Sequence, residues 1–455
     1  MLRWKKLPKN WPILLPLLVM TAGYFYYPKY PELSQGTRVG NSCLAGQRRA
    51  NRWVKKDIPH LPDLDANFDD LGLAHLAKAA YLLQPKYIGI HPREKIPPAL
   101  PLLVNGIFIF MSMLLYFLLS KVFGNIWGGV IQGVIYLAPQ VSQNLYSLDV
   151  YSIPLYAACF LGILVFASAK LRGKRAVAVG IAGAFGIYLC NFTRSSSWLV
   201  VVSLLPVLVF PVFSARFFKS DVSPEKFRRR VLTGMLVLTA LMWKDKILHP
   251  GTGHPIWHSI HAGLLEFGGH IGPDQRIYPG FVPAAEIPPG AVAENTWNDY
   301  FEYRFARAVA PKVNLYSPEY GKILRQDYLR FWRNYPWDML RLHAKRIWNI
   351  VDWDIWSWRL YDHNVNPNFW LGLIARAIFL GVFLLALFFV GWRQTLFAAG
   401  FVAPLSLSGV IVFSSYGYYQ TPFRVCLFVF ILFLVRELWR RYRGAGDPRP
   451  LQAKF

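Results

Sequence analysis

Long apolar runs alternate with short polar segments along most of the chain. A helix that crosses a bilayer needs roughly 20 mostly apolar residues, and ten runs approach that length, although some are short or contain proline. The runs are 11–27, 99–119, 126–143, 151–169, 176–191, 196–214, 231–247, 369–391, 395–413 and 422–438. This pattern predicts an all-α polytopic membrane protein with about ten transmembrane helices.

Basic residues are distributed unevenly between these runs. The alternate short loops 144–150, 192–195 and 414–421 contain a single basic residue, Arg194. The other short loops and both ends of the chain carry Arg3, Lys5, Lys6, Lys9, Lys121, Lys170, Arg172, Lys174, Arg175, Arg216, Lys219, Arg228, Arg229, Arg230, Arg393, Arg440, Arg441 and Arg443. Because cytoplasmic loops are enriched in lysine and arginine, we expect this basic set and both termini in the cytoplasm, which requires an even number of helices.

This topology places two long segments, 28–98 and 248–368, on the outside of an inner or plasma membrane. In the second, the stretch 320–350 mixes apolar and basic residues with a helical rhythm, which is typical of helices in the membrane interface. The expected organisation is a transmembrane module (1–247), a large outer region (248–368), the last transmembrane helices (369–438) and a cytoplasmic tail (439–455). The basic start of the chain also resembles a signal peptide, but no small-residue cleavage site follows, so we expect an uncleaved first helix.

The composition agrees with a membrane location. Hydrophobic residues make up 54% and charged residues 16% of the 455 residues, which is too apolar for a soluble protein of this size. The net charge of +25 is explained by basic residues at the ends of apolar runs, where they meet anionic lipid, and no basic soluble domain suggests nucleic-acid binding. Three of the four cysteines lie in apolar runs, so no disulfide framework is implied.

Acidic residues just outside the predicted membrane are candidates for catalysis. Asp69 and Asp70 directly precede a helix-like stretch, 71–84, and Asp149 is the only ionisable residue of the loop 145–150. An adjacent carboxylate pair can bind a divalent metal or provide a general base. The alternatives are capping of the helix by the first pair and a solvated loop acid for Asp149.

Two arginines and a lysine are candidates for binding a phosphate. Arg194 is the exception to the charge asymmetry, and Arg424 begins the last helix from the outside. A guanidinium matches the oxygens of a phosphate or phosphodiester, whereas snorkelling to the interface is the simpler alternative for Arg194. Lys244 ends the seventh helix on the same side, where an ion pair with Asp245 is the simplest explanation.

A cluster of histidines follows the seventh helix. His254, His258 and His261 are spaced by four and three residues, which places them on one face of a helix, and Glu266 and His270 follow. The spacing suits metal ligation, but there is no glutamate between paired histidines as in a zinc protease motif. Substrate contact and ordinary interfacial packing are the other two interpretations.

These features together resemble the GT-C superfamily of membrane glycosyltransferases, in particular the branch of the protein O-mannosyltransferases and the lipid A aminoarabinose transferase. The residues that carry the resemblance are Phe68-Asp69-Asp70 in a long first outer loop, Asp149 in the second, the sequence Asn191-Phe-Thr-Arg-Ser195, and the aromatic approach to Arg424. The family's acidic pair is often aspartate-glutamate, its arginine motif carries a proline that is missing here, and the histidine cluster has no counterpart.

The resemblance implies inverting transfer of a sugar from a polyprenyl-phosphate donor to a lipid, glycan or protein acceptor on the extracytoplasmic side. On this reading Asp69 is the base, Asp70 and Asp149 position the acceptor or a divalent metal ion, and Arg194 and Arg424 hold the phosphate. Two rival hypotheses remain. A polymerase or ligase of lipid-linked glycans would use the arginine- and histidine-rich segment 248–368. A lipid or solute transporter would need charged residues near the helix centres, where this sequence has few.

Overall fold

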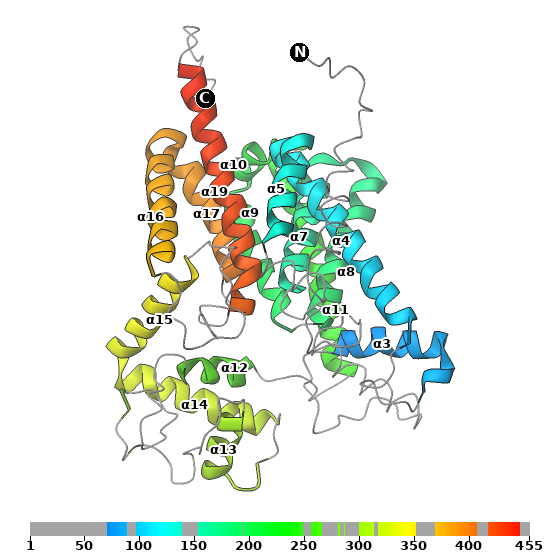
Figure 1. The fold of residues 1–455 in the computed structure, drawn as a ribbon, viewed down its shortest axis with the longest axis vertical. Helices are drawn as coiled ribbons and strands as arrows, with labels where there is room; N and C mark the ends of the chain where they lie inside the picture. Colours follow the sequence, from blue (N-terminus) through cyan, green and yellow to red (C-terminus); the bar gives the residue numbers. More distant parts are fainter. Residues whose placement is uncertain are drawn as a thin grey trace.

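The computed structural model describes residues 71–88, 97–138, 153–193, 195–248, 256–265, 281–282, 286, 300–313, 317–351, 369–406 and 417–445. Every regular element in these ranges is a helix (Figure 1). The first half contains α3 (Leu71–Leu83), α4 (Ala99–Phe123), α5 (Asn125–Leu137), α7 (Ile153–Lys170), α8 (Gly173–Thr193), α9 (Leu205–Val209), α10 (Pro211–Phe217) and α11 (Pro224–Leu248). The second contains α12 (Ile256–Ala262), α13 (Tyr300–Val309), α14 (Pro318–Asn334), α15 (Pro336–Ile350), α16 (Phe369–Ala386), α17 (Trp392–Val402) and α19 (Gly417–Ala445). The predicted all-α class is confirmed for the described residues.

Several helices have the length and composition to cross a membrane. In the described ranges there are four such stretches, and a fifth if one bent pair counts as a single span. The four are Asn105–Phe123, Ile153–Lys170, Gly173–Asn191 and Gly372–Leu405. These helices indicate a membrane protein. The predicted run 11–27 lies outside the described residues.

The predicted run 196–214 is not one straight helix. A 3₁₀ helix over Ser195–Leu204 leads into α9, and α10 then departs at an angle of 110°. Pro211 explains the break, because it has no N–H to continue the helix and because it disfavours helical backbone at Phe210, whose φ and ψ are −120° and 63°.

The long apolar stretch Gly372–Leu405 reverses direction in its middle. The Thr395 hydroxyl donates a hydrogen bond to the carbonyl of Ala386 at 3.1 Å, whereas nine residues of straight helix would separate these positions by about 13 Å. The reversal falls at Gly391, whose φ of 109° is available to glycine but strained for other residues. α16 and α17 therefore form a hairpin. The turn falls next to the boundary between the predicted runs 369–391 and 395–413.

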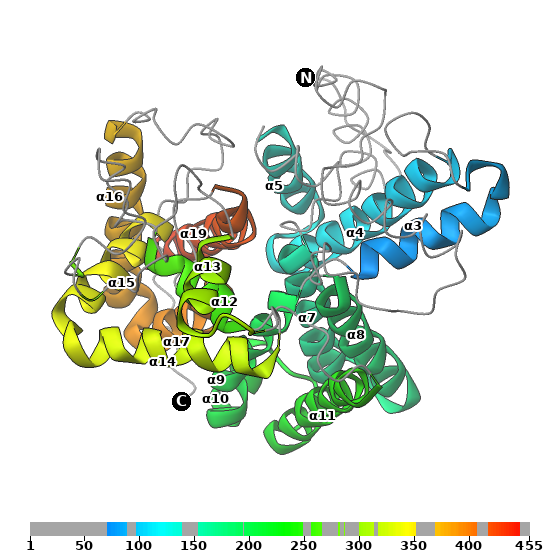
Figure 2. The ribbon, with the colours of Figure 1, turned by 90° about the horizontal axis from the view of Figure 1, so that it is seen from below.

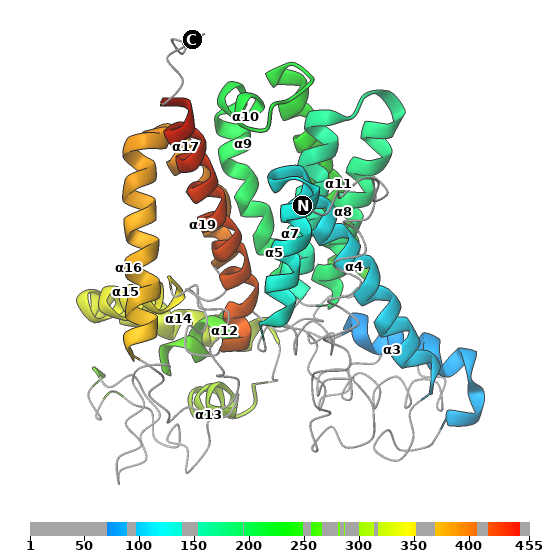
Figure 3. The same cartoon turned by 45° about the horizontal axis from the view of Figure 1, so that its top comes forward.

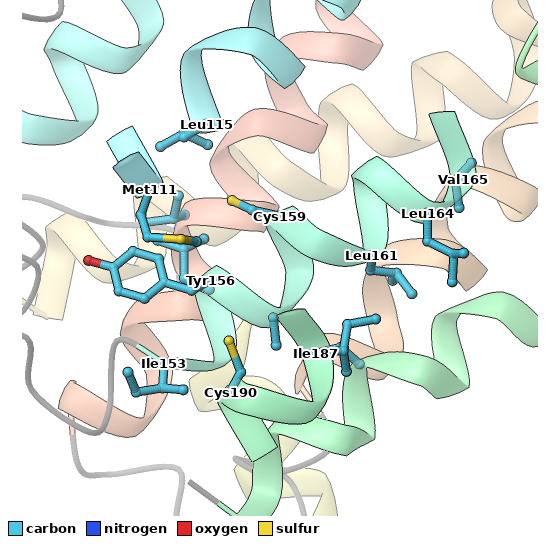
Figure 4. Close-up of a cluster of buried hydrophobic side chains, with 14 of the residues drawn as sticks. Met111, Leu115, Ile153, Tyr156, Cys159, Leu161, Leu164, Val165, Ile187 and Cys190 are labelled. Carbon is cyan, nitrogen blue, oxygen red and sulfur yellow. The ribbon is translucent and has the colours of Figure 1, made fainter. Parts of the chain in front are cut away.

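Small residues allow the closest helix contacts in the bundle, which we define as α4, α5, α7, α8, α11, α16, α17 and α19. A Cβ at Gly183 would lie 3.1 Å from the backbone of α7, and one at Gly186 would lie 2.2 Å from the ring of Phe160. Such contacts are typical of membrane helices, which gain little from the hydrophobic effect and associate through close packing. The apolar core beside them includes Tyr156, Leu161 and Ile187 (Figure 4).

A buried polar triad joins α4 to α5. Tyr136 donates to the hydroxyl of Ser112 at 2.6 Å, and the amide of Gln132 donates to the Ser112 carbonyl at 2.7 Å. All three side chains are at most 2% exposed. Polar groups inside a bundle need such internal partners because neither lipid nor core offers any.

The basic loops of the described residues meet at one end of the bundle, here called the basic end. Lys170 pairs with Asp221 at 3.0 Å, which joins the α7–α8 turn to the α10–α11 turn. Arg436 donates to the carbonyl of Val122, and Arg441 donates to that of Val390, so α19 links the α4–α5 and α16–α17 turns. The views agree that these turns share one end of the molecule (Figures 1 and 3).

Four helices, α12 to α15, form a separate unit at the other end, here called the cap. Its core is made by residues such as Phe305, Leu324, Phe331 and Met339, and this core is distinct from those of the bundle. The cap lies over the half of the bundle that contains α16, α17 and α19, while α3 lies beside α4 (Figure 2). The helical rhythm of 320–350 is thus confirmed as two helices, which separate at Tyr335 where Pro336 begins α15.

Candidate functional site

Most of the predicted site residues lie outside the described part of the chain. These are Asp69, Asp70, Asp149, Arg194, His254, Glu266 and His270. The helix expected after the aspartate pair is confirmed, since α3 begins at Leu71. Lys244 belongs to the last turns of α11, and its side chain is not among those described. The structure therefore bears directly on three candidates, which are Arg424, His258 and His261.

Arg424 is buried near the cap end of the bundle. It follows Pro422 in the second turn of α19, about 10 Å along the axis from the first residue of that helix. Its side chain is 9% exposed, and its neighbours Phe423 and Val425 belong to two apolar clusters. A guanidinium stays charged under all physiological conditions, so burial at this depth suits it to binding an anionic group.

His258 connects α12 to α14. Its Nδ1 lies 2.6 Å from the hydroxyl of Tyr320, within hydrogen-bonding distance. The imidazole also packs against the ring of Tyr303 from α13, with 5.2 Å between centroids, and Tyr303 in turn stacks on Tyr320. With His258 only 2% exposed, this side chain is part of the cap core.

His261 sits between two carboxylates, one turn further along α12. Its Nε2 lies 2.9 Å from Asp327 of α14, and its Nδ1 lies 3.8 Å from Glu302 of α13. Burial lowers the pKa of this imidazole, but the hydrogen bond to Asp327 and the negative charges of Asp327 and Glu302 outweigh that effect and raise the pKa to about 9. His261 is therefore a cation at neutral pH, held by acids from two other helices.

The ion network continues from Asp327 towards the surface of the cap. Arg330 lies 2.8 Å from Asp327 and 3.7 Å from Glu286. The hydroxyl of Tyr335 donates to Glu286 at 2.5 Å, and this hydrogen bond raises the pKa of the tyrosine. Directly after α12, the carbonyl of Gly263 accepts a hydrogen bond from the buried Arg346 of α15. Charged groups thus hold all four cap helices together.

This arrangement suits a positioning role better than direct chemistry. His261, Glu302 and Asp327 are 1%, 1% and 7% exposed, so a substrate does not reach them in this conformation. Among the described residues no group of three or more histidine, cysteine, aspartate or glutamate side chains is placed to hold a metal ion. Metal binding by the wider histidine segment stays a prediction, because His254, Glu266 and His270 are not described.

The acids that pair with His261 were missed in the sequence, although a signal was present for Asp327. Asp327 falls on the same helical face as Tyr320, Leu324 and Phe331, which are all buried. Arg346 similarly follows the buried Met339 and Leu342 of α15 at spacings of seven and four. A charged residue in the apolar phase of an amphipathic helix indicates a buried ionic contact, since an unpaired charge there is too costly.

Comparisons with protein-family models, with curated proteins and with solved structures found no match to this chain.

Proposed function

We propose that this chain is a GT-C-type membrane glycosyltransferase. It transfers a sugar from a polyprenyl-phosphate-linked donor to an acceptor on the extracytoplasmic face, with inversion at the anomeric carbon. In this proposal ten helices cross the membrane and both termini are cytoplasmic. The resemblance of the sequence motifs supports the chemistry, and the burial of Arg424 is the single structural observation that carries it.

The two ends of the bundle support the proposed orientation. All described turns rich in lysine and arginine share the basic end, as expected if that end faces the cytoplasm. The helix ends nearest in sequence to the candidate residues lie at the other end: α3 begins at Leu71, α7 begins at Ile153, α8 ends at Thr193 and α19 begins at Gly417 (Figure 3). These positions support a common outer site for Asp69, Asp149, Arg194 and Arg424.

Arg424 supports a lipid-linked phosphate as the ligand. A polyprenyl phosphate keeps its chain in the bilayer and its phosphate just below or at the surface, so its partner must lie at the end of a membrane helix. In this proposal α19 crosses the membrane, and Arg424 then has this position. The other end of the helix carries Arg443, about 28 Å further along the axis. That distance is close to the thickness of the hydrocarbon core, roughly 30 Å.

The proposed reaction is a displacement at the anomeric carbon of the donor. The acceptor hydroxyl forms the new carbon–oxygen bond while the bond from that carbon to the phosphate oxygen breaks, and the electron pair stays on the leaving polyprenyl phosphate. Asp69 accepts the hydroxyl proton as general base, and Asp70 and Asp149 position the acceptor or a divalent metal ion. Arg194 and Arg424 stabilise the charge that develops on the phosphate. Lys244, which lies in the last turns of α11, assists them.

The test compares two arginines of the same helix. Arg424→Gln should weaken binding of polyprenyl monophosphate, measured with radiolabelled lipid on the purified protein, by about tenfold or more, because a charge-assisted hydrogen bond is worth about 1.5–3 kcal/mol. Arg443→Gln removes an exposed guanidinium at the basic end and should leave binding unchanged. Equal binding by both variants would overturn the role of Arg424.

A second measurement tests the transfer itself. The donor is a polyprenyl-phosphate sugar with a radiolabel in the sugar. Asp69→Asn should abolish transfer of this label to any covalent product, while binding of the lipid persists. Retained turnover would remove Asp69 as the base. A product that carries a long glycan would favour the polymerase or ligase, and accumulation of solute in proteoliposomes without a covalent product would favour the transporter.

A further inference from the structure

Helix α15 has two apolar faces, of which only one is used inside the protein. One face carries Met339 and Leu342, which are buried in the cap core, together with the buried Arg346. On the opposite side the apolar residues are exposed. Trp337, Leu340, Ile347 and Trp348 are between 46% and 74% exposed.

The exposed residues form one continuous stripe. At about 100° per residue, Trp337, Leu340, Ala344, Ile347 and Trp348 fall within an arc of about 100° on the helix. Arg341 and Lys345, which are exposed, follow directly on one border of this arc. An apolar stripe that ends in tryptophan at both ends and is bordered by basic residues is the pattern of a helix that lies in a membrane surface.

The contacts of Trp348 place this stripe at the edge of the bundle. Arg376, in the second turn of α16, donates from its Nε to the Trp348 carbonyl at 2.9 Å, and its guanidinium lies 5.0 Å from the centre of the Trp348 ring. The neighbouring residues Leu373 and Ile374 of α16 are exposed and belong to a stretch able to cross a membrane. The exposed stripe of α15 therefore adjoins an exposed apolar surface at the start of α16, and the ends of these two helices lie next to each other (Figure 1).

We propose that α15 lies in the bilayer surface, with its apolar stripe at the level of the headgroups and upper acyl chains. Arg341 and Lys345 bind the phosphates of anionic phospholipids, since basic residues near an anionic membrane are attracted to its surface. The cap is thus anchored to the membrane by α15 as well as by the chain connections to the bundle. This anchoring is independent of the reaction that the protein catalyses.

The test measures the depth of a spin label on the stripe. In a variant without native cysteines, Leu340→Cys is labelled with a nitroxide and reconstituted in vesicles of phosphatidylcholine alone or with a third of phosphatidylglycerol. Lys322→Cys, on an exposed position of α14, is the matched control. The ratio of oxygen to nickel-chelate accessibility should be severalfold higher at position 340 than at position 322, because oxygen concentrates in lipid and the chelate stays in water.

The charge of the lipid gives the second part of the test. The ratio of oxygen to nickel-chelate accessibility at position 340 should be higher in the anionic vesicles than in phosphatidylcholine alone. The double substitution Arg341→Ala and Lys345→Ala should remove that increase. Ala344→Cys, on the same stripe, replaces position 340 if the first variant does not fold. Equal accessibility at 340 and 322 would overturn the proposal. A label at 340 that neither reagent reaches would also overturn it, because a second protein surface would then cover the stripe.

Discussion

The bundle and the cap are both all-helical, but their helices are held together by different means. In the bundle, glycines such as Gly128 and Gly183 bring helix backbones into contact, and the neutral polar groups of Ser112, Gln132 and Tyr136 hydrogen-bond to one another between α4 and α5. In the cap, a cation on α12 lies between carboxylates from α13 and α14. The bundle therefore depends on shape, whereas the cap depends on charge.

This difference has an energetic consequence. Buried ion pairs add little net stability, because desolvation offsets their attraction, but the loss of one partner leaves a costly unpaired charge. The cap should therefore be sensitive to single charge changes and to pH. The bundle should be sensitive to added volume at its glycines, because close-packed backbones cannot separate without loss of contacts across the whole interface.

The largest effect is expected from Asp327→Ala in the cap. This change removes the partner of both His261 and Arg330 and should destabilise the cap by about 3–5 kcal/mol. Hydrogen–deuterium exchange should show faster exchange in α12 and α14 and no change in α7 and α8. The matched control is Asp338→Ala on α15, whose ion pair with Arg341 at 3.6 Å is exposed and is worth less than about 1 kcal/mol. Equal effects of the two variants would show that the buried network does not hold the cap.

A somewhat smaller effect is expected from pH. The pKa of His261 is raised from 6.5 to about 9 in the folded cap, which corresponds to a stabilisation on the order of 3 kcal/mol. Since the folded pKa is the higher one, this contribution is fully present below pH 6.5, decreases between pH 6.5 and 9, and is absent above. Within the described part of the chain, Asp327 and Glu302 face this imidazole, and Arg330 adjoins it through Asp327.

The measurement follows protection of α12 and α14 from hydrogen exchange at pH 6, 7.5 and 9, after correction for the intrinsic pH dependence of exchange. The difference in protection between the wild-type protein and His261→Gln should shrink as the pH rises. A difference that stays constant or grows would contradict a protonated His261.

In the bundle, the sequence predicts the position of several helices but not how they bend or pack. Hydropathy locates α4, α7 and α8, and it divides α16 from α17 close to Gly391, because the requirement for about 20 apolar residues acts along the chain. It does not predict the bend at Pro211 or the close approach of Gly128, which depend on a neighbouring helix or a local backbone angle. Local composition is therefore sufficient to predict where the helices lie in the sequence, but not which helices contact each other.

In the cap, the contacts of the candidate site are even harder to predict from the sequence. The spacing of His258 and His261 correctly places both on one face of a helix, and each does contact α14. Their partners lie 62 and 66 residues away in the chain, so no local pattern connects them. The metal interpretation of the cluster rested on residues close in sequence, Glu266 among them, whereas the charge that balances His261 comes from acids on two other helices.

The smallest of these effects, Gly128→Ala, tests the contribution of shape to the bundle. A Cβ at this position would lie 2.7 Å from the backbone nitrogen of Ser120, which cannot move aside as a flexible side chain could, so α4 and α5 must separate. We expect a loss of about 1–3 kcal/mol, seen as a lower thermal midpoint in detergent. Gly106→Ala on α4 has no atom within 4 Å of the new Cβ and should be neutral or slightly stabilising, because alanine favours a helix by up to about 1 kcal/mol over glycine. Because neither glycine carries charge, the difference between the two variants should also be independent of pH from 6 to 9, unlike that of the cap. A pH-dependent difference, or equal midpoints for both variants, would remove the distinction between a bundle held by shape and a cap held by charge.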